Sequence, residues 1–114
     1  MTRGRLAAVR LVGLLLIIAL SGCGNESPRP VALKDLAAYP TAYQGQLLAL
    51  TGTARNFADP PHAWIEDADL NRVEILPAEK ILPYLGETIT VVGQFSYSRN
   101  TGRRLQVERV EHSD

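Results

Sequence analysis

Side chains suited to covalent chemistry are scarce in this chain of 114 residues. It has one cysteine, Cys23, and two histidines, His62 and His112. Nucleophilic catalysis needs a serine, threonine or cysteine beside a base that a third group orients. His112 lies next to the C-terminus, where order is often lost, and His62 follows a proline-rich turn, where we expect it to be solvated. We therefore predict no enzyme active site and no cofactor.

A second pattern could bind a cation. Asp67, Asp69 and Asn71 alternate in the stretch DADLN, a spacing similar to the first ligands of a calcium-binding loop. Such a loop turns on a glycine and ends on a bidentate glutamate, but Arg72 and Ala78 stand at those two positions. We interpret the stretch as an Asx-rich turn, with a calcium or small-ligand carrier as an alternative and no metal ligands assigned.

The most specific functional pattern combines aromatic rings with arginines. Trp64 precedes the apolar Ile65 in one predicted strand, and Arg72 precedes Val73 in the next. Neighbours in a strand point to opposite faces, so Trp64 and Arg72 are predicted to point outward. Exposed aromatic and arginine side chains are enriched where partners dock, and aromatic rings stack on bases or sugars. The predicted binding face consists of Arg55, Phe57, Trp64, Arg72, Tyr97, Arg99, Arg103 and Arg104.

Two features argue for a plainer interpretation of this face. Glu66 and Glu74 share the outward row and interrupt its positive charge. Trp64 could also pack beneath the loop of residues 59–61 without touching any partner. A surface without function is thus the alternative.

The charge balance limits the kinds of partner. Twelve basic and twelve acidic side chains cancel, but Arg3, Arg5 and Arg10 have no acidic neighbour before Glu26. Without those three arginines, nine basic and twelve acidic side chains leave a net charge of −3. Such a domain lacks the positive field that supplies most of the affinity for a phosphate backbone. Nucleic acid is therefore a disfavoured partner, and a single-strand binder is kept as an alternative function.

The N-terminal segment predicts where the protein is delivered. Residues 11–20 read LVGLLLIIAL, which is shorter than the roughly 20 apolar residues that a membrane-spanning helix needs. Arginines precede this run and small residues follow it. This arrangement is typical of a secretory signal peptide, which we assign to residues 1–22.

Residues 20–23 read LSGC, which resembles the lipobox of bacterial lipoproteins. The resemblance implies a diacylglyceryl group on the Cys23 thiol, cleavage between Gly22 and Cys23, and an acyl chain on the new amino terminus. Two or more chains anchor a protein stably, since each buried methylene contributes about 0.8 kcal/mol. Gly24 stands where an aspartate would resemble an inner-membrane retention signal, so the periplasmic face of the outer membrane is implied. The alternative is an incidental thiol.

Residues 23–32 carry prolines without apolar periodicity, so we predict a lipidated tether there. One or two helical turns follow at residues 33–38 and end before Pro40.

One phrase occurs twice in the chain. Residues 43–52 read YQGQLLALTG, and residues 84–93 read YLGETITVVG. Alternation predicts two half-buried strands, each with an internal glycine that marks a bulge or a bend. Long strands with such bends suit a small, strongly coiled barrel. The predicted inward rows are Leu48, Leu50, Gly52 and Ala54, and Ile89, Val91, Gly93 and Phe95.

The remaining elements complete the predicted architecture. Short strands are predicted at residues 62–67 and 72–76, and a short helix after Pro77 that packs Ile81, Leu82 and Leu85. A hairpin loop at residues 98–102 leads to a last strand at residues 103–110, with Leu105 and Val107 inward.

Three strands, a helix and two strands is the chain order of the OB-fold, a five-stranded Greek-key barrel with a short helix between its third and fourth strands. The stretch LKDLAAYPTAYQGQLLALTGTA also resembles the opening of small OB-fold domains of bacterial envelope proteins. The resemblance covers residues 33–111 and leaves residues 112–114 as a tail. A two-layer domain of sheet and helix is the rival fold. We expect a non-enzymatic lipoprotein that docks an unidentified envelope protein or glycan.

Overall fold

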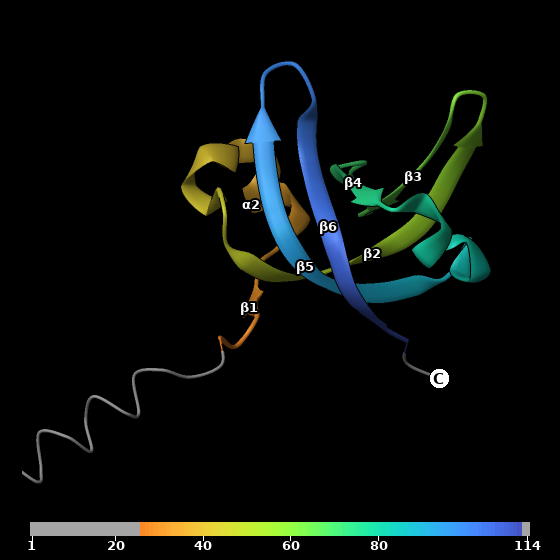
Figure 1. Ribbon diagram of the computed structural model, residues 1–114, viewed down its shortest axis with the longest axis horizontal. Helices are drawn as coiled ribbons and strands as arrows, with labels where there is room; N and C mark the ends of the chain where they lie inside the picture. The colour runs from red at the N-terminus through yellow and green to blue at the C-terminus, as the bar shows by residue number, and fades with distance from the viewer. Residues whose placement is uncertain (1–25, 113–114) are drawn as a thin grey trace, which may run out of the picture.

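The structure, a computed structural model, describes residues 26–112 of the chain. The predicted signal peptide, its cleavage site and Cys23 lie outside the described residues. Figure 1 shows a curled sheet from which two long hairpins rise on the same side. Strand β1 (Arg29–Pro30) and the C-terminal end of the last strand lie at the opposite end.

Five strands close into a barrel. The sheet order β2-β3-β4-β6-β5 is closed by the pairing of β2 with β5. Strands β4 and β6 are parallel, and the other neighbours in the barrel are antiparallel. The predicted OB-fold-like barrel is thereby confirmed, and the rival two-layer fold is wrong. The strands are β2 (Leu47–Ala58), β3 (Pro61–Glu66), β4 (Arg72–Leu76), β5 (Thr88–Ser98) and β6 (Gly102–Glu111).

The end of the predicted tether lies on the barrel. Strand β1 runs parallel to β2, where Arg29 pairs with Leu48 and Pro30 with Ala49. The Arg29 guanidinium also sits 5.2 Å from the centroid of the Tyr43 ring. These contacts hold the chain against the barrel from residue 29 onward.

The two copies of the repeated phrase lie directly against each other. The internal glycine of each copy pairs with an apolar residue of the other copy, and the Leu50–Val91 pair lies midway between these two pairs. The two copies are therefore related by an approximate two-fold axis, because the matching residues exchange places across the ladder. The register pairs Leu48 with Gly93, Leu50 with Val91, and Gly52 with Ile89.

The turns before β2 and β5 obey the same symmetry. Gly45 and Gly86 both have positive φ, at 77° and 85°, a conformation that glycine adopts without steric cost. The Gly45 amide donates to the Phe95 carbonyl, and the Gly86 amide donates to the Ala54 carbonyl, each at 2.9 Å. Each turn is thereby fastened to the far end of the other copy.

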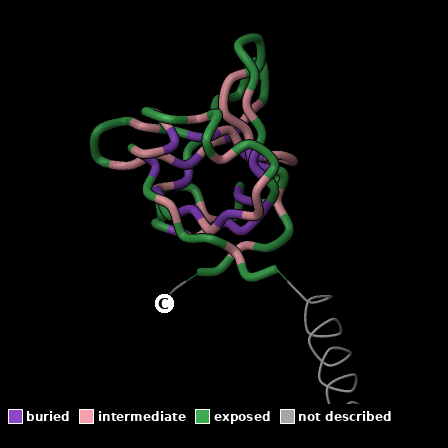
Figure 2. The backbone as a smooth tube through the Cα atoms, turned by 90° about the vertical axis from the view of Figure 1, so that its left-hand side faces the viewer, coloured by how far each residue is buried: buried purple, intermediate pink, exposed green. Residues whose placement is uncertain are grey.

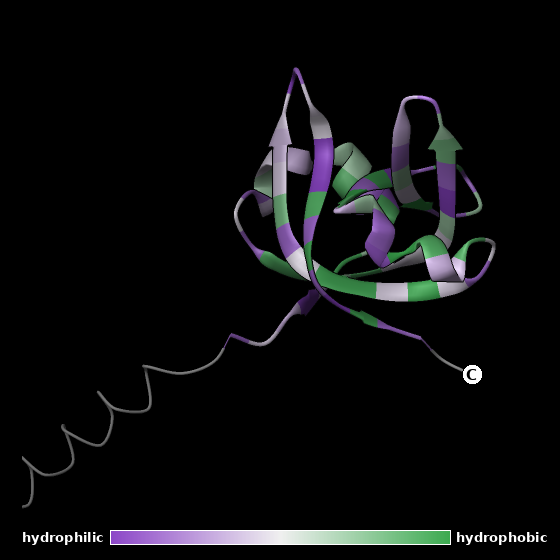
Figure 3. Cartoon of the chain, turned by 45° about the vertical axis from the view of Figure 1, so that its right-hand side comes forward, coloured by the Kyte–Doolittle hydropathy of each residue, from purple (hydrophilic) through white to green (hydrophobic). Residues whose placement is uncertain are grey.

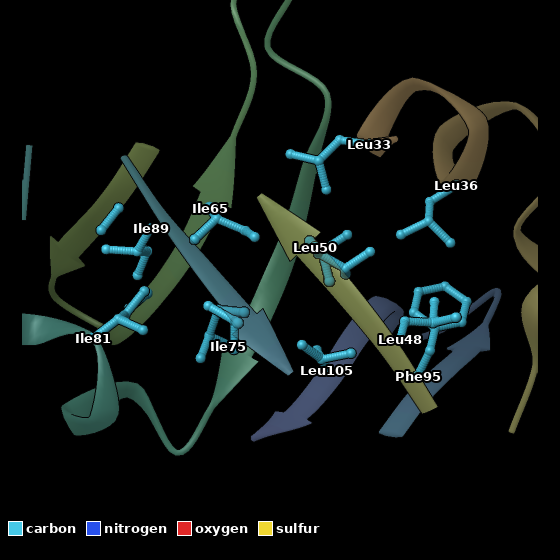
Figure 4. Packing of buried hydrophobic residues seen from close by; sticks show 14 residues of the cluster. Leu33, Leu36, Leu48, Leu50, Ile65, Ile75, Ile81, Ile89, Phe95 and Leu105 are labelled. Carbon is cyan, nitrogen blue, oxygen red and sulfur yellow. The ribbon is translucent and has the colours of Figure 1, made fainter. Parts of the chain in front are cut away.

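The core fills the inside of the barrel, where the buried positions face inward (Figure 2). The six apolar side chains of the two predicted inward rows are all at most 1% exposed. Leu33 and Leu36 of helix α2 (Leu33–Ala38) pack at one end of this cluster, and Ile81 packs at the other (Figure 4). The α2 prediction is confirmed, and the helix serves as a plug.

The short helix predicted after Pro77 is confirmed as helical structure of the 3-10 type. Two 3-10 turns, η2 (Ala78–Lys80) and η3 (Leu82–Tyr84), form it. Pro83 lacks an amide hydrogen and disfavours the α conformation at the residue before it, so an α-helix cannot continue here. Only Ile81 of the predicted apolar set is buried; Leu82 and Leu85 are 42% and 40% exposed.

Both internal glycines lie where another strand passes very close. A Cβ on Gly93 would lie 2.1 Å from the Gln106 carbonyl oxygen, and the register of β5 and β6 shifts between Val92 and Gly93. A Cβ on Gly52 would lie 2.8 Å from the Glu66 carbonyl oxygen. Beyond Gly52, strand β2 passes from β5 to β3. The predicted bulge is confirmed at Gly93, and Gly52 marks a change of partner strand.

Candidate binding groove

The two rising hairpins stand apart on the same side of the barrel (Figure 3). A groove lies between them on the outer face of β3 and β4. It encloses about 390 Å³ and receives side chains from both hairpins. Of the eight residues of the predicted binding face, Trp64, Arg72, Tyr97 and Arg103 line it. The full lining is His62, Trp64, Arg72, Glu74, Tyr97, Thr101, Gly102 and Arg103.

A row of side chains in contact with one another, which we call the aromatic ladder, forms one side of the groove. It consists of Phe57, His62, Trp64 and Arg72. The Phe57 and His62 rings pair across β2 and β3 with centroids 5.8 Å apart. The His62 and Trp64 rings stack at 5.2 Å, and the Arg72 guanidinium carbon lies 4.8 Å from the Trp64 centroid. The row therefore consists of one tilted ring pair, one stacked ring pair and one cation–π contact.

The Trp64 ring already has two partners within the ladder. His62 precedes Trp64 by two positions in β3, while Arg72 pairs with Glu66, two positions beyond Trp64. Stacking of Trp64 on a base or a sugar stays a prediction, and a ligand that stacks there would have to share the ring with His62 and Arg72. Stacking on Phe57, which is 55% exposed, also stays a prediction.

Glu66 joins the ladder to β2. Its Oε1 accepts a hydrogen bond from Trp64 Nε1 at 2.8 Å, and its Oε2 meets Arg55 Nε at 3.3 Å. The Glu66 side chain is only 15% exposed, while Arg55 is 51% exposed. Arg55 of the predicted face is thus engaged in an ion pair outside the groove lining.

The β5–β6 hairpin forms the other side of the groove. Tyr97 pairs with Arg103 on the side of the hairpin that carries Phe95 and Leu105 lower down. Tyr97 is partly buried against the edge of the core, and from there outward this side of the hairpin forms a wall of the groove. The same side of the β5–β6 hairpin therefore carries Phe95 and Leu105 inside the barrel, and Tyr97 and Arg103 nearer the hairpin tip.

Two local devices hold this hairpin in shape. The amide of Gln44 spans the backbone of Tyr97, accepting from its N–H at 2.6 Å and donating to its carbonyl at 3.2 Å. At the tip, the Ser98 and Thr101 hydroxyls lie 2.7 Å apart, and the Thr101 amide donates to Ser98 Oγ at 3.1 Å. These bonds satisfy backbone groups that strand pairing leaves open.

The charges in the groove are not balanced. Glu74 forms an ion pair with Arg104 at 3.2 Å, as Glu66 does with Arg55. Arg72 and Arg103 form no ion pair with any residue between 26 and 112. Glu66 and Glu74 were predicted to interrupt the positive charge of this face. Each is instead paired with an arginine outside the groove lining, so the guanidinium groups of Arg72 and Arg103 stay unpaired.

These two unpaired arginines are adjacent. Arg103 Nε donates to the backbone carbonyl of Arg72 at 3.0 Å, while the Arg72 side chain lies over Trp64. Five of the nine lysines and arginines that follow residue 25 belong to the predicted face. Of these five, only Arg72 and Arg103 line the groove.

Two residues of the predicted face lie outside the groove lining, and one residue that was not predicted lies within it. Arg99 is exposed in the β5–β6 loop and Arg104 is bound to Glu74; neither lines the groove. His62, which we expected to be merely solvated, belongs to the ladder. Its Nδ1 lies 2.9 Å from the Pro60 carbonyl, which can only accept, so Nδ1 carries the hydrogen. Its shared parity with Trp64 was the signal that could have placed it.

The Asp-rich turn between β3 and β4 binds its own backbone. Asp67 Oδ1 accepts from the amides of Asp69 and Asn71, both at 2.9 Å, and Oδ2 accepts from Asn71 Nδ2 at 3.0 Å. The Asn71 side-chain bond lowers the Asp67 pKa, with smaller opposing desolvation and further help from backbone amides. Between residues 26 and 112, no three His, Cys, Asp or Glu residues are grouped so as to hold a metal ion.

Two further findings bear on the class of protein. Within the described range, no helix is both long and apolar enough to cross a membrane. No family model matches the chain, and no curated protein matches it. The class is therefore defined by topology and geometry as an OB-fold-like barrel, with its groove on the face where such barrels bind ligands.

Proposed function

We propose that this chain is a non-enzymatic envelope lipoprotein whose barrel docks a partner in the groove. The observation that carries this proposal is the pair of unpaired guanidinium groups, Arg72 and Arg103, between two hairpins. Arginine and aromatic side chains are enriched among the residues that dominate binding energies at interfaces. The proposed partner is a protein or a glycan of the envelope.

The proposed lipid anchor on Cys23 agrees with the direction in which the groove opens. Residues 24–28 separate Cys23 from β1, and a chain of this length reaches about 20 Å when fully extended. Strand β1 lies at the end of the barrel opposite the hairpin tips (Figure 1). A barrel anchored this way, on the periplasmic face of the outer membrane, would present its groove away from the bilayer.

The test of the groove is site-specific photo-crosslinking in intact cells. A crosslinking residue at Thr101, which lines the groove, is expected to capture a specific envelope component. The matched control is Glu108, which is exposed on β6 and does not line the groove. Equal capture from both positions, or none from Thr101, would contradict docking in the groove.

The anchor has its own test. Cys23→Ser is expected to abolish incorporation of a labelled fatty acid and to release the protein from membranes. The matched control is Ser21→Ala, which leaves the cysteine in place and should still be labelled. Unchanged labelling of Cys23→Ser would refute the lipobox interpretation.

A second candidate function is binding of single-stranded nucleic acid. It is favoured by the two unpaired arginines, Arg72 and Arg103, in a groove on the face where OB-folds bind ligands. Binding of this kind weakens steeply with added salt. An oligothymidylate titration at two salt concentrations distinguishes it from the first proposal.

A further inference from the structure

We propose that the groove recognises carboxylate groups of an acidic polypeptide segment through Arg72 and Arg103. This proposal rests on the proposed function, since it names the ligand of the same groove. It names the main contact as pairing between ligand carboxylates and the two arginines, rather than stacking of a ligand ring on Trp64.

The first argument is the fixed position of the two guanidinium groups. Arg72 is held over the Trp64 ring, and Arg103 is held by its Nε bond to the Arg72 carbonyl at 3.0 Å. Each keeps terminal N–H donors that no carboxylate among the described residues uses. A guanidinium presents its donors in a planar fork that matches a carboxylate, and prior fixation reduces the entropy lost on binding.

The second argument concerns ring faces. Sequence-tolerant binding of single strands needs aromatic faces on which successive bases stack, together with a basic track for the phosphates. The Trp64 ring already contacts His62 and Arg72, and Glu74 lies within the groove lining. Two unpaired arginines suit a few separate carboxylates better than a phosphate on every unit of a polymer.

The third argument is an apolar contact at the far end of the ladder. Phe57 is 55% exposed and leads through His62 and Trp64 to Arg72. A polypeptide that places carboxylates on Arg72 and Arg103 can lay an apolar side chain on Phe57. The expected ligand therefore combines glutamate or aspartate with a nearby aromatic or aliphatic residue.

The test uses the full chain purified in detergent and a labelled short peptide of glutamate, glycine and phenylalanine. The probe is compared with the same peptide carrying glutamine in place of glutamate, and with oligothymidylate. We expect the glutamate peptide to bind and the glutamine peptide to bind at least about tenfold more weakly, which corresponds to roughly 1.4 kcal/mol. Equal binding of the two peptides, or preferential binding of oligothymidylate, would overturn the proposal.

The variants are Arg103→Gln and Arg72→Gln, with Arg109→Gln as the matched control. Arg109 lies on β6 like Arg103 but is paired with Glu111, away from the groove. Each groove variant is expected to weaken binding of the glutamate peptide about tenfold, and the control to leave it unchanged. Thermal melting checks the fold, and Arg103→Lys, which keeps the charge without the fork, should bind between wild type and Arg103→Gln. An equal loss in Arg109→Gln would overturn the assignment to these two arginines.

The two proposals fail in distinguishable ways. If Thr101 captures a partner in cells but the glutamate peptide does not bind, the acidic chemistry is wrong and the docking groove stands. If Thr101 captures nothing and the peptide does not bind, both proposals are wrong.

Discussion

The two halves of the barrel, one beginning at Gly45 and the other at Gly86, share a backbone plan but differ in the chemistry they present. Each half opens with a positive-φ glycine, runs through an inward apolar row and a close-packed glycine, and ends in a rising hairpin. The β2–β3 hairpin carries the aromatic ladder, whereas the β5–β6 hairpin carries a tyrosine and arginines. The shared backbone arrangement forms the two sides of the groove, and the side chains that follow Gly52 and Gly93 determine the chemistry of each side.

The halves also differ in how tightly their glycines are packed. Gly93 faces the backbone of β6 at a bulge, while Gly52 faces the backbone of β3 where β2 changes partner. A side chain at Gly93 would meet a carbonyl oxygen at 2.1 Å, compared with 2.8 Å at Gly52. The two-fold symmetry is therefore only approximate at these two glycines, and Gly93 is the more closely packed of the two.

The largest expected effect tests this difference. Gly93→Ala should lower the free energy of unfolding by about 3 kcal/mol or more, because the rigid backbone of β6 must move. Gly52→Ala should cost less, about 1–3 kcal/mol. Urea denaturation measures both, with Gln94→Ala, an exposed neighbour in β5, as the control. A greater loss at Gly52 would contradict the order of the two close approaches.

The next effect compares the acidic residues of the outer face. Glu66→Ala leaves Trp64 Nε1 without its acceptor and Arg55 without its partner, so we expect a loss of about 1–3 kcal/mol in stability. Glu74→Ala removes a more exposed ion pair with Arg104 and should cost about 0.2–1 kcal/mol. Chemical denaturation followed by tryptophan fluorescence measures both. Glu66→Gln, which keeps an acceptor oxygen, should recover most of the loss; similar costs at Glu66 and Glu74 would contradict the special role of Glu66.

A smaller effect is expected in the β5–β6 hairpin. Gln44→Ala removes both side-chain bonds to the Tyr97 backbone, in an exposed setting, and should cost about 0.5–1.5 kcal/mol. The Tyr97 amide should exchange its hydrogen faster, while amides of the β2–β3 hairpin should be unaffected. Equal acceleration in both hairpins would show that they are not braced separately.

The smallest effect uses the β3–β4 turn, which belongs to neither rising hairpin, as a reference. Because the pKa of Asp67 is lowered on folding, its contribution to stability is present above the ordinary aspartate pKa of about 3.9 and is lost as the pH falls through the lower folded value. Asn71→Ala should raise the Asp67 pKa, because the largest cause of the shift is removed. A carbon-detected NMR titration of the Asp67 carboxyl measures this, and an unchanged pKa would contradict the assigned cause.

Much of the fold could be predicted because its signals are local. Alternation identified the inward rows of β2 and β5, and the glycines marked the points where strands bend or change partners. The short helix after Pro77 was predicted, but the packing of Leu82 and Leu85 was wrong, because the two 3-10 turns on either side of Ile81 bury only that side chain.

The candidate groove was predicted only in outline. Strand parity predicted that Trp64 and Arg72 point outward, but it could not predict that Arg72 lies over the Trp64 ring or that His62 stacks on the same ring. Those contacts depend on the register between β3 and β4, and on the closure that brings the β5–β6 hairpin across them.

The amino-acid sequence by itself determined which side of each strand is apolar and where the chain must bend, since these follow from the two-residue period of a strand and from the side-chain-free backbone of glycine. Only the tertiary structure decided which arginines remain unpaired. Glu66 and Glu74 each form one ion pair, with Arg55 across the β2–β3 hairpin and with Arg104 across the β4–β6 pair, and both pairs depend on strand registers that local sequence patterns do not fix.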